Sequence, residues 1–233
     1  MSADDRERDR RRVERKTAFA ARRRDTPADA GAQKDERLPP GQTWAHEKWP
    51  ILDLGDQPEI SRRSWRLCVD GLVEEPLTLD FDGLVALGEV ETADDFHCVT
   101  SWSTQGNRWK GVRFVDLMER ALPSPEAAFV LFESSDTAPD TSEFYTTNLP
   151  LAACLDPSVL LVHSWNDRPL EREHGGPVRM FVPKRYAWKS AKWLKKITLL
   201  ERDRPGYWEV RGYSNSAKPW EDDRYGRPSL LGF

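Results

Sequence analysis

Hydrophobic and polar residues alternate in several stretches of the chain, and this alternation predicts strands. Trp65, Leu67 and Val69 occupy every second position just before the turn signal Asp70-Gly71, which is the pattern of a half-buried strand. Comparable alternating or short apolar runs predict further strands at residues 77–81, 96–100, 128–133, 143–148, 159–165 and 178–182.

A different spacing marks one helix. Phe114, Leu117, Met118, Ala121 and Leu122 fall at helical spacing, and Pro123 follows them. That period predicts one apolar helical face, and a proline is a common stop signal. Shorter helices are predicted at residues 82–87 and 149–155. Many strands with few short helices indicate an α+β fold class, as a mixed and β-rich domain.

Four segments have less regular patterns. Residues 38–64 are rich in proline and charge and are expected to form an ordered arm over the surface. Residues 102–110 are mostly polar and are predicted to be a loop. Residues 192–200 fit neither the helical nor the strand period. The chain after Arg202 is predicted to be mostly loop, and its many aromatic residues are expected to pack onto the body of the domain.

Charge separates the first part of the chain from the rest. Residues 1–37 hold 12 Lys/Arg and 9 Asp/Glu with Phe19 as their only aromatic residue, so they are predicted to form a disordered charged tail. This tail carries +3 of the formal net charge of −4, which leaves −7 on residues 38–233. An acidic body argues against nucleic-acid binding.

No apolar segment is long enough to span a membrane, and no apolar stretch follows the arginine pairs near the N-terminus. Both an integral membrane span and an export signal need such a stretch. The sequence therefore predicts a cytoplasmic protein.

Three cysteines offer candidate chemistry, and their spacing supports neither a disulfide framework nor a zinc or haem motif. Cys98 lies near the end of a predicted strand, where scaffolds often present reactive groups, and a thiolate is a suitable ligand for a transition metal. A buried structural role is the commoner fate of a single cysteine. The residue pattern alone favours the structural role for Cys98, and Cys68 and Cys154 fit that role well.

Two other segments have both a functional and a structural interpretation. His174-Gly175-Gly176-Pro177-Val178-Arg179 combines glycines that allow a close approach with an arginine that can grip a phosphate. Residues 183–193 interleave cations with aromatic residues, which suits an anionic ring-containing ligand or single-stranded RNA. For the first segment taken alone, a plain turn before a strand is the favoured interpretation. For the second, the structural alternative is a solvated basic loop with aromatic residues in the core. Signature sequences of serine hydrolases, nucleotide-binding loops and zinc proteases are absent.

The order of these motifs is more specific than any of them alone. Cys98-Val-Thr-Ser-Trp-Ser, Trp109-Lys-Gly-Val, Phe132-Glu-Ser, His174-Gly-Gly-Pro-Val-Arg and Val182-Pro-Lys-Arg-Tyr-Ala-Trp-Lys-Ser-Ala-Lys-Trp follow one another along the chain. Together they resemble the molybdopterin domain of the sulfite oxidase superfamily. The resemblance is closest to its bacterial branch, which includes the methionine sulfoxide reductase catalytic subunit and small sulfite-oxidase-like oxidoreductases. It implies a molybdopterin-binding domain over residues 38–233.

This resemblance implies a molybdenum–molybdopterin cofactor and a role for particular residues. Cys98 is expected to be the protein's ligand to molybdenum and the catalytic residue. Arg179 is expected on the pterin phosphate, and Ser134 takes the place of a family threonine. The complete set of expected cofactor contacts is Lys48, Trp49, Ser134, His174, Arg179, Ser190, Ala191 and Lys192.

The resemblance also implies a two-electron oxygen-atom transfer on a small molecule that donates or accepts oxygen. Sulfite oxidases follow the ligand cysteine with an Asn-Arg-Arg run, whereas this chain has Thr100-Ser101-Trp102. A sulfite pocket would need other arginines, such as Arg108 or Arg113, so a sulfoxide-like or unknown substrate is favoured.

The chain has no haem, iron–sulfur or flavin motif of its own, so a separate electron-transfer partner is expected. Two alternatives remain at this point. One is a non-catalytic molybdopterin-binding or carrier protein, and the other is an RNA-binding module.

Overall fold

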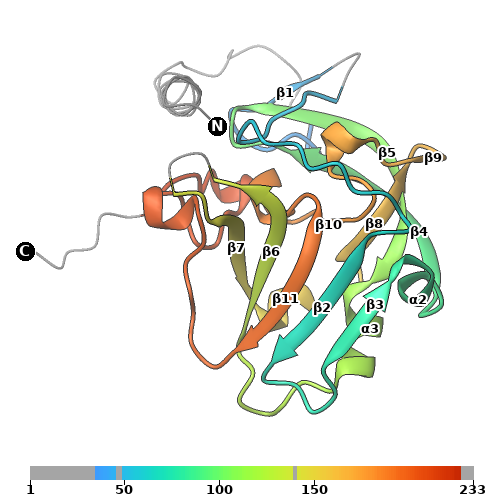
Figure 1. The fold of residues 1–233 in the computed structure, drawn as a ribbon. Coiled ribbons are helices and arrows are strands. Elements are labelled where there is room, and N and C mark those ends of the chain that lie inside the picture. Colours follow the sequence, from blue (N-terminus) through green and yellow to red (C-terminus); the bar gives the residue numbers. More distant parts are fainter. Residues whose placement is uncertain (1–34, 46–48, 139–140, 227–233) are drawn as a thin grey trace, which may run out of the picture.

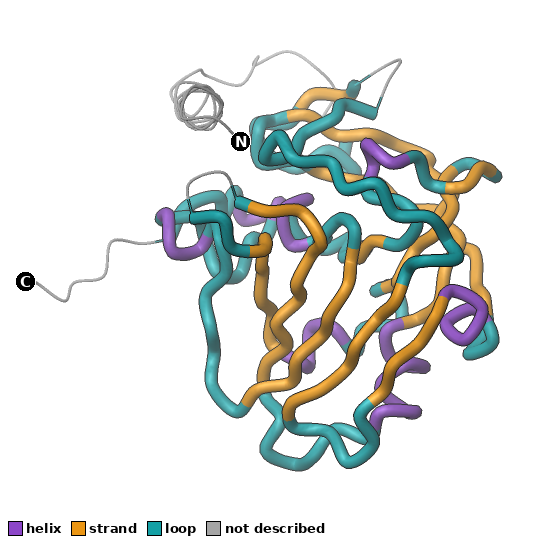
Figure 2. Tube along the Cα trace, viewed as in Figure 1, coloured by secondary structure: helices purple, strands orange, loops and turns teal. Residues whose placement is uncertain are grey.

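The computed structural model describes residues 35–45, 49–138 and 141–226. Their strands form two sheets, seen as separate groups of arrows in Figure 1 and as orange segments in Figure 2. Helices are few and short, so the predicted β-rich α+β fold is confirmed. Most of the predicted charged tail and the predicted contact Lys48 lie outside the described residues. Among those residues, no helix is long and apolar enough to cross a membrane.

The five-stranded sheet has the order β3-β2-β11-β6-β7. Its central strand β11 is parallel to β2 and antiparallel to β6, with Ile197 opposite both Val69 and Phe132. These three side chains are fully buried, and each contributes roughly 1.5–3 kcal/mol by leaving water. The strands are β2 (Arg66–Gly71), β3 (Leu77–Asp80), β6 (Phe129–Thr137), β7 (Phe144–Pro150) and β11 (Leu194–Leu200).

The six-stranded sheet follows the order β1-β5-β8-β10, with β4 paired to β5 and β9 paired to β8. Buried residues of β8 and β10, such as Leu161 and Met180, share one core with the five-stranded sheet and with helix α3 (Phe114–Ala121). The strands are β1 (Thr43–Trp44), β4 (Glu89–His97), β5 (Trp102–Arg113), β8 (Leu160–Trp165), β9 (Arg168–Pro169) and β10 (Arg179–Phe181).

The strand β5 overturns one prediction. Residues 102–110 were expected to be a polar loop, and that prediction is wrong because they form most of this long central strand. The polar side chains of Ser103, Thr104 and Asn107 are buried rather than solvated. Hydrogen bonds satisfy them: Asn107 Nδ2 donates to Thr104 O, and Ser103 Oγ contacts His97 Nδ1 at 2.8 Å. Buried polar groups are tolerated when they are paired in this way.

The strand predicted at 96–100 is also only partly right. Strand β4 begins earlier, at Glu89, and ends at His97, so residues 98–100 belong to the turn that joins β4 to β5. The ambiguous segment 192–200 contains strand β11. The predicted helices correspond to α2 (Phe81–Val85), α3 and the short α4 (Leu151–Cys154).

The end of the described chain is irregular but packed. After β11 it contains only the 3-10 helices η3 (Glu209–Arg211) and η4 (Pro219–Glu221). Tyr207 and Tyr213 are buried against the body, whereas Trp220 stays 49% exposed. The expectation that the aromatic residues of this segment pack onto the domain is therefore confirmed for the two tyrosines.

Candidate cofactor site around Cys98

Cys98 lies in a tight turn between β4 and β5. Its backbone N–H donates to Trp102 O at 2.9 Å, and Ser101 N donates back to Cys98 O at 3.0 Å. Ser101 adopts a φ of 72°, a left-handed conformation that few non-glycine residues take. The thiol is 3.3 Å from Thr100 Oγ1, and the residue is 5% exposed. The turn thus presents one sulfur atom from a nearly buried position.

A cavity of about 140 Å³ lies beside this thiol. Seven of the nine site residues predicted from the sequence line it: Trp49, Cys98, His174, Arg179, Ser190, Ala191 and Lys192. Ser134 is buried in β6 but is not among the lining residues, and its role stays a prediction. Residues more than 140 positions apart in sequence therefore meet around one space, in the concave form typical of a cofactor site.

Arg179 brings a buried positive charge to this cavity. It is 2% exposed, and its guanidinium donates to the carbonyls of Met180, His174 and Ser190 at 2.9–3.2 Å. All three acceptors are neutral, so they orient the group without cancelling its charge. Burial lowers the pKa of Arg179 to about 9, which leaves it protonated at neutral pH. A fixed, partly desolvated cation of this kind favours an anionic ligand.

Trp49 and His174 form the next part of the wall. Their rings stack with centroids 4.0 Å apart and planes within 5°, and the guanidinium of Arg179 lies 5.2 Å from the Trp49 ring. Burial, followed by the charges of Arg179 and Lys192, lowers the pKa of His174 to about 4. His174 is therefore neutral at pH 7 and can offer a hydrogen bond without adding charge.

The segment around η2 (Ala187–Lys189) supplies a further part of the wall. Ser190 Oγ accepts from Val182 N at 3.0 Å, which fixes the position of its backbone. Lys192 Nζ donates to Glu173 O at 2.6 Å. Gly175 has a φ of +95° and allows its segment to approach the segment of Lys192 closely, because a Cβ at position 175 would lie 2.7 Å from Lys192 Cβ.

Several lining residues were not predicted as site residues, among them Asp136, Tyr145 and Trp188. Tyr145 is buried and donates from its hydroxyl to Trp188 O at 2.7 Å. Asp136 is 4% exposed, and its Oδ1 accepts no hydrogen bond from the residues that the structure describes. Asp136 follows Ser134 by two positions on β6 and shares its buried face. The strand period could have pointed from Ser134 to Asp136.

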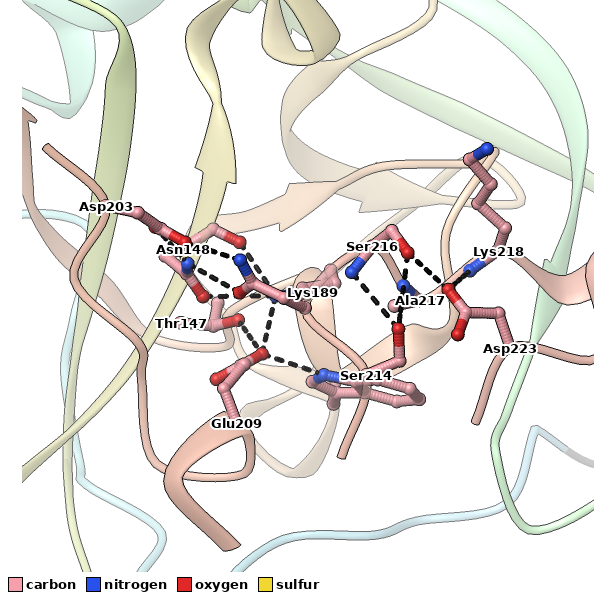
Figure 3. Close-up of polar contacts among 12 residues, drawn as sticks. Thr147, Asn148, Lys189, Asp203, Glu209, Ser214, Ser216, Ala217, Lys218 and Asp223 are labelled. Carbon is pink, nitrogen blue, oxygen red and sulfur yellow. Dashed lines mark hydrogen bonds and ion pairs between the residues drawn. The ribbon is translucent and has the colours of Figure 1, made fainter. Parts of the chain in front are cut away.

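A buried ion pair supports the η2 wall from behind (Figure 3). Lys189 Nζ lies 2.6 Å from Glu209 Oε1, and the two side chains are 0% and 2% exposed. The same carboxylate accepts from Thr147 Oγ1 at 3.1 Å and from Trp188 Nε1 at 2.9 Å. Lys189 also donates to Asn148 O at 2.9 Å. The network therefore fixes the indole of Trp188, which lines the cavity.

The buried carboxyl of Asp136 predicts an unusual pH dependence for the cofactor-free protein. Burial raises its pKa from 3.8 to about 7. Its contribution to stability is thus fully present below pH ~4 and is lost as pH rises through about 7, by about 1.4 kcal/mol per pKa unit. Asp136→Asn should abolish this loss and leave the variant more stable than wild type above pH ~7.

Denaturant titrations at roughly pH 5 and pH 8 measure this difference. Asp156→Asn is the matched control, because Lys184 and Ser158 overcome the opposing effect of burial and lower the pKa of Asp156 to about 2. That variant should lose stability by a similar amount at both pH values, because the stabilising effect of a lowered carboxyl pKa is already present above pH ~4. An Asp136→Asn protein that stays less stable than wild type at both pH values would contradict the prediction.

Comparison with known proteins places the chain among molybdopterin proteins. Residues 54–208 match the family model described as oxidoreductase molybdopterin binding domain. A relative from Bacillus subtilis (strain 168), the uncharacterized oxidoreductase YuiH, is 40% identical over 190 residues, which cover 81% of this chain and 92% of the relative.

Two relatives have more specific names. The mitochondrial sulfite oxidase of Drosophila melanogaster is 30% identical over 177 residues, covering 67% of this chain and 30% of that protein. The protein-methionine-sulfoxide reductase catalytic subunit MsrP of Campylobacter jejuni is 29% identical over 163 residues, covering 64% and 54%. The chain thus spans about half of one relative and less than a third of the other.

A solved structure supports the fold. The sulfane dehydrogenase SoxCD from Paracoccus pantotrophus superposes with a TM-score of 0.55 at 24% identity, over 63% of this chain and 40% of that one. At this identity the likeness concerns the fold alone. The sequence resemblance to the sulfite oxidase superfamily is confirmed by these matches taken together.

Proposed function

Because the chain belongs to the oxidoreductase molybdopterin binding domain family, we propose that it holds molybdenum–molybdopterin in the Cys98 cavity and transfers one oxygen atom and two electrons. The observation that carries the proposal is the meeting of a thiol, a buried guanidinium and a buried carboxyl around one cavity. When bound, the cofactor supplies the redox chemistry, while the protein supplies a ligand, orientation and electrostatics.

The residues of the cavity fit such a cofactor. The Cys98 thiolate is a soft donor for the metal, and metal binding itself favours its deprotonated form. Arg179 would hold the phosphate through its charge. Asp136 has an acceptor atom without a hydrogen bond from the described residues, and a pterin ring carries N–H groups that such an acceptor can bind. His174 and Lys192 would complete the set of polar contacts.

For the substrate we propose a neutral sulfoxide-like oxygen donor. The arginines that a sulfite pocket would need do not line the cavity: Arg108 is half-exposed and pairs with Asp167, and Arg113 is exposed. The cavity wall near Cys98 is instead aromatic, with Trp102, Trp188, Trp208 and Tyr213. Aromatic rings favour a thioether-like group over a small hydrated anion. One relative is named as a methionine sulfoxide reductase subunit.

Electrons must come from another molecule under this proposal. The sequence contains no CxxC, CxxCH or GxGxxG pattern, which are the common marks of bound iron–sulfur, haem and dinucleotide groups. We therefore propose a separate redox partner. The relative named as a catalytic subunit is, by that name, also part of a larger enzyme.

Molybdenum content of the purified full chain tests the proposal. Wild type made in a host that synthesises the cofactor should contain near-stoichiometric molybdenum by plasma mass spectrometry. In Cys98→Ser, sulfoxide reduction by a reduced dye should fall by more than about 100-fold, since even changes beside a ligand cost 10–100-fold. Cys68→Ser is the matched control, because Cys68 is a half-buried cysteine of β2 away from the cavity.

Three results would contradict part or all of the proposed function. Absence of molybdenum and pterin from the wild type would overturn the assignment. Turnover of sulfite but not of sulfoxides would leave the cofactor in place and overturn the substrate class. A loaded wild type that turns over neither would favour the alternative of a non-catalytic carrier.

A further inference from the structure

The turn that carries Cys98 is held by both ends of the described chain. Gln42 comes from the segment before β1 and Arg224 from the segment after η4. Both lie outside residues 54–208, the part that matches the family model. Each is nearly buried, with 6% of its surface exposed. The turn that presents the thiol is therefore braced by residues that the family match does not include.

The N-terminal contact lies along one edge of the hairpin that β4 and β5 form around the Cys98 turn. Gln42 Nε2 donates to Cys98 O at 3.0 Å, and its Oε1 accepts from Ser103 Oγ at 3.2 Å. Strand β1 pairs in parallel with β5, and Thr43 N donates to Ser101 O at 3.0 Å. Farther out, the guanidinium of Arg37 binds both carboxylate oxygens of Asp95.

The C-terminal contact is a single buried arginine. Arg224 Nη1 donates to Val99 O and, at 2.7 Å, to Ser101 Oγ, while its Nε donates to Asp222 Oδ1 at 2.6 Å. A guanidinium is suited to this task because its N–H groups point in fixed directions within one plane. Together with Gln42 and Thr43, it binds the carbonyls of three of the four residues in the turn.

The segment that delivers Arg224 is itself well ordered. Ser214 N donates to Arg224 O at 3.0 Å, and Ser214 Oγ accepts from Ser216 N and Ala217 N at 3.2 and 3.1 Å. Asp223 accepts from Ser216 Oγ in the same loop (Figure 3). Tyr186 N then ties the loop to the cavity wall by donating to Ala217 O at 2.8 Å. Arg224 is thus presented by a fixed scaffold.

We propose that Gln42 and Arg224 form a clamp that positions the Cys98 thiol toward the cavity. They are positioning residues that act through the turn, and their link to a metal ligand rests on the proposed function. A tight turn with a left-handed Ser101 has few internal hydrogen bonds of its own. Loss of a hydrogen bond to a charged group should therefore raise the fraction of molecules with an open turn by roughly tenfold or more.

Hydrogen exchange on the purified full chain tests the clamp directly. In Arg224→Gln, the amides of residues 98–103 should exchange roughly tenfold faster or more, while those of α3 stay unchanged. Arg224→Lys keeps the charge but replaces the planar fork with a single point donor, so it should lie between Arg224→Gln and wild type. Arg202→Gln, at an exposed arginine after β11, is the matched control and should behave as wild type.

A second readout concerns the metal ligand. In loaded protein, the Mo(V) electron paramagnetic resonance signal should shift in Arg224→Gln and in Gln42→Leu but stay unchanged in Arg202→Gln. Faster exchange in α3 as well would mean that Arg224→Gln destabilises the whole domain. In that case Gln42→Leu tests the clamp, because it removes a neutral contact on the other side of the turn. Unchanged exchange at residues 98–103 in Gln42→Leu and Arg224→Gln would overturn the clamp.

The clamp and the proposed function fail in distinguishable ways. If the wild type contains no molybdenum but the turn exchanges faster in the two variants than in wild type, the clamp is supported and only the proposed function is overturned. Normal molybdenum in wild type, with no change of exchange or spectrum in the variants, would leave the proposed function and overturn the clamp.

Discussion

Replacing Glu209 with alanine should lower the free energy of unfolding by about 3–5 kcal/mol, because it leaves the Lys189 ammonium buried without its carboxylate. Burial already lowers the pKa of Lys189, and the charge of Glu209 opposes that effect. The same change removes the acceptor for Trp188 Nε1 and Thr147 Oγ1. Since Trp188 lines the cavity, cofactor retention should fall together with stability.

Chemical denaturation at neutral pH, beside Glu201→Ala, measures this effect. Glu201 is an exposed carboxylate just after β11, so its removal should change stability by less than about 0.5 kcal/mol. The double variant Lys189→Met/Glu209→Leu should recover much of the loss, since an apolar pair can replace a buried ion pair. A loss below about 1 kcal/mol in Glu209→Ala would show that water reaches the pair.

The substitution Gly175→Ala should be nearly as damaging, for a steric reason. Its φ of +95° is unfavourable for alanine, and the new Cβ would lie 2.7 Å from Lys192 Cβ and 2.9 Å from its Cα. Backbone strain and overpacking each cost about 1–3 kcal/mol, so the sum should reach about 2–6 kcal/mol. Lys192 would be pushed away from the cavity, and pterin content should fall as well.

Gly212→Ala separates the two costs. Gly212 has a similar φ of +89°, but nothing lies within 4 Å of the position its Cβ would take. Denaturation of both variants therefore isolates the contact with Lys192. Equal losses of stability would mean that only the backbone conformation matters and that Lys192 moves aside without cost.

The sequence predicted the fold class and seven residues of the cavity because those features follow local patterns or short motifs. The period of two in β2 and the helical period in α3 require no knowledge of the tertiary structure. The same reasoning failed for β5, since the polarity of Ser103, Thr104 and Asn107 suggested a loop. Only the neighbouring strands and buried partners explain why these residues form a strand.

The missed parts of the site have a common physical origin. Asp136 and Tyr145 carry no motif, and they become notable only because strands distant in sequence place them around the same cavity as Cys98. Arg224 is one of many arginines in the chain, and its contacts with the Cys98 turn span more than 120 positions. No local period reports contacts over such separations.

Strand β11 has a consequence for the timing of cofactor loading. It lies between β2 and β6 and pairs with both, so one sheet stays divided until residue 200 has left the ribosome. The residues that brace the Cys98 turn arrive later still, with Arg224. Chains are synthesised from the N-terminus at about 5–20 residues per second, and the braced turn therefore forms only after Arg224 has been synthesised. We expect chains truncated before Arg224 to be poor acceptors of the cofactor.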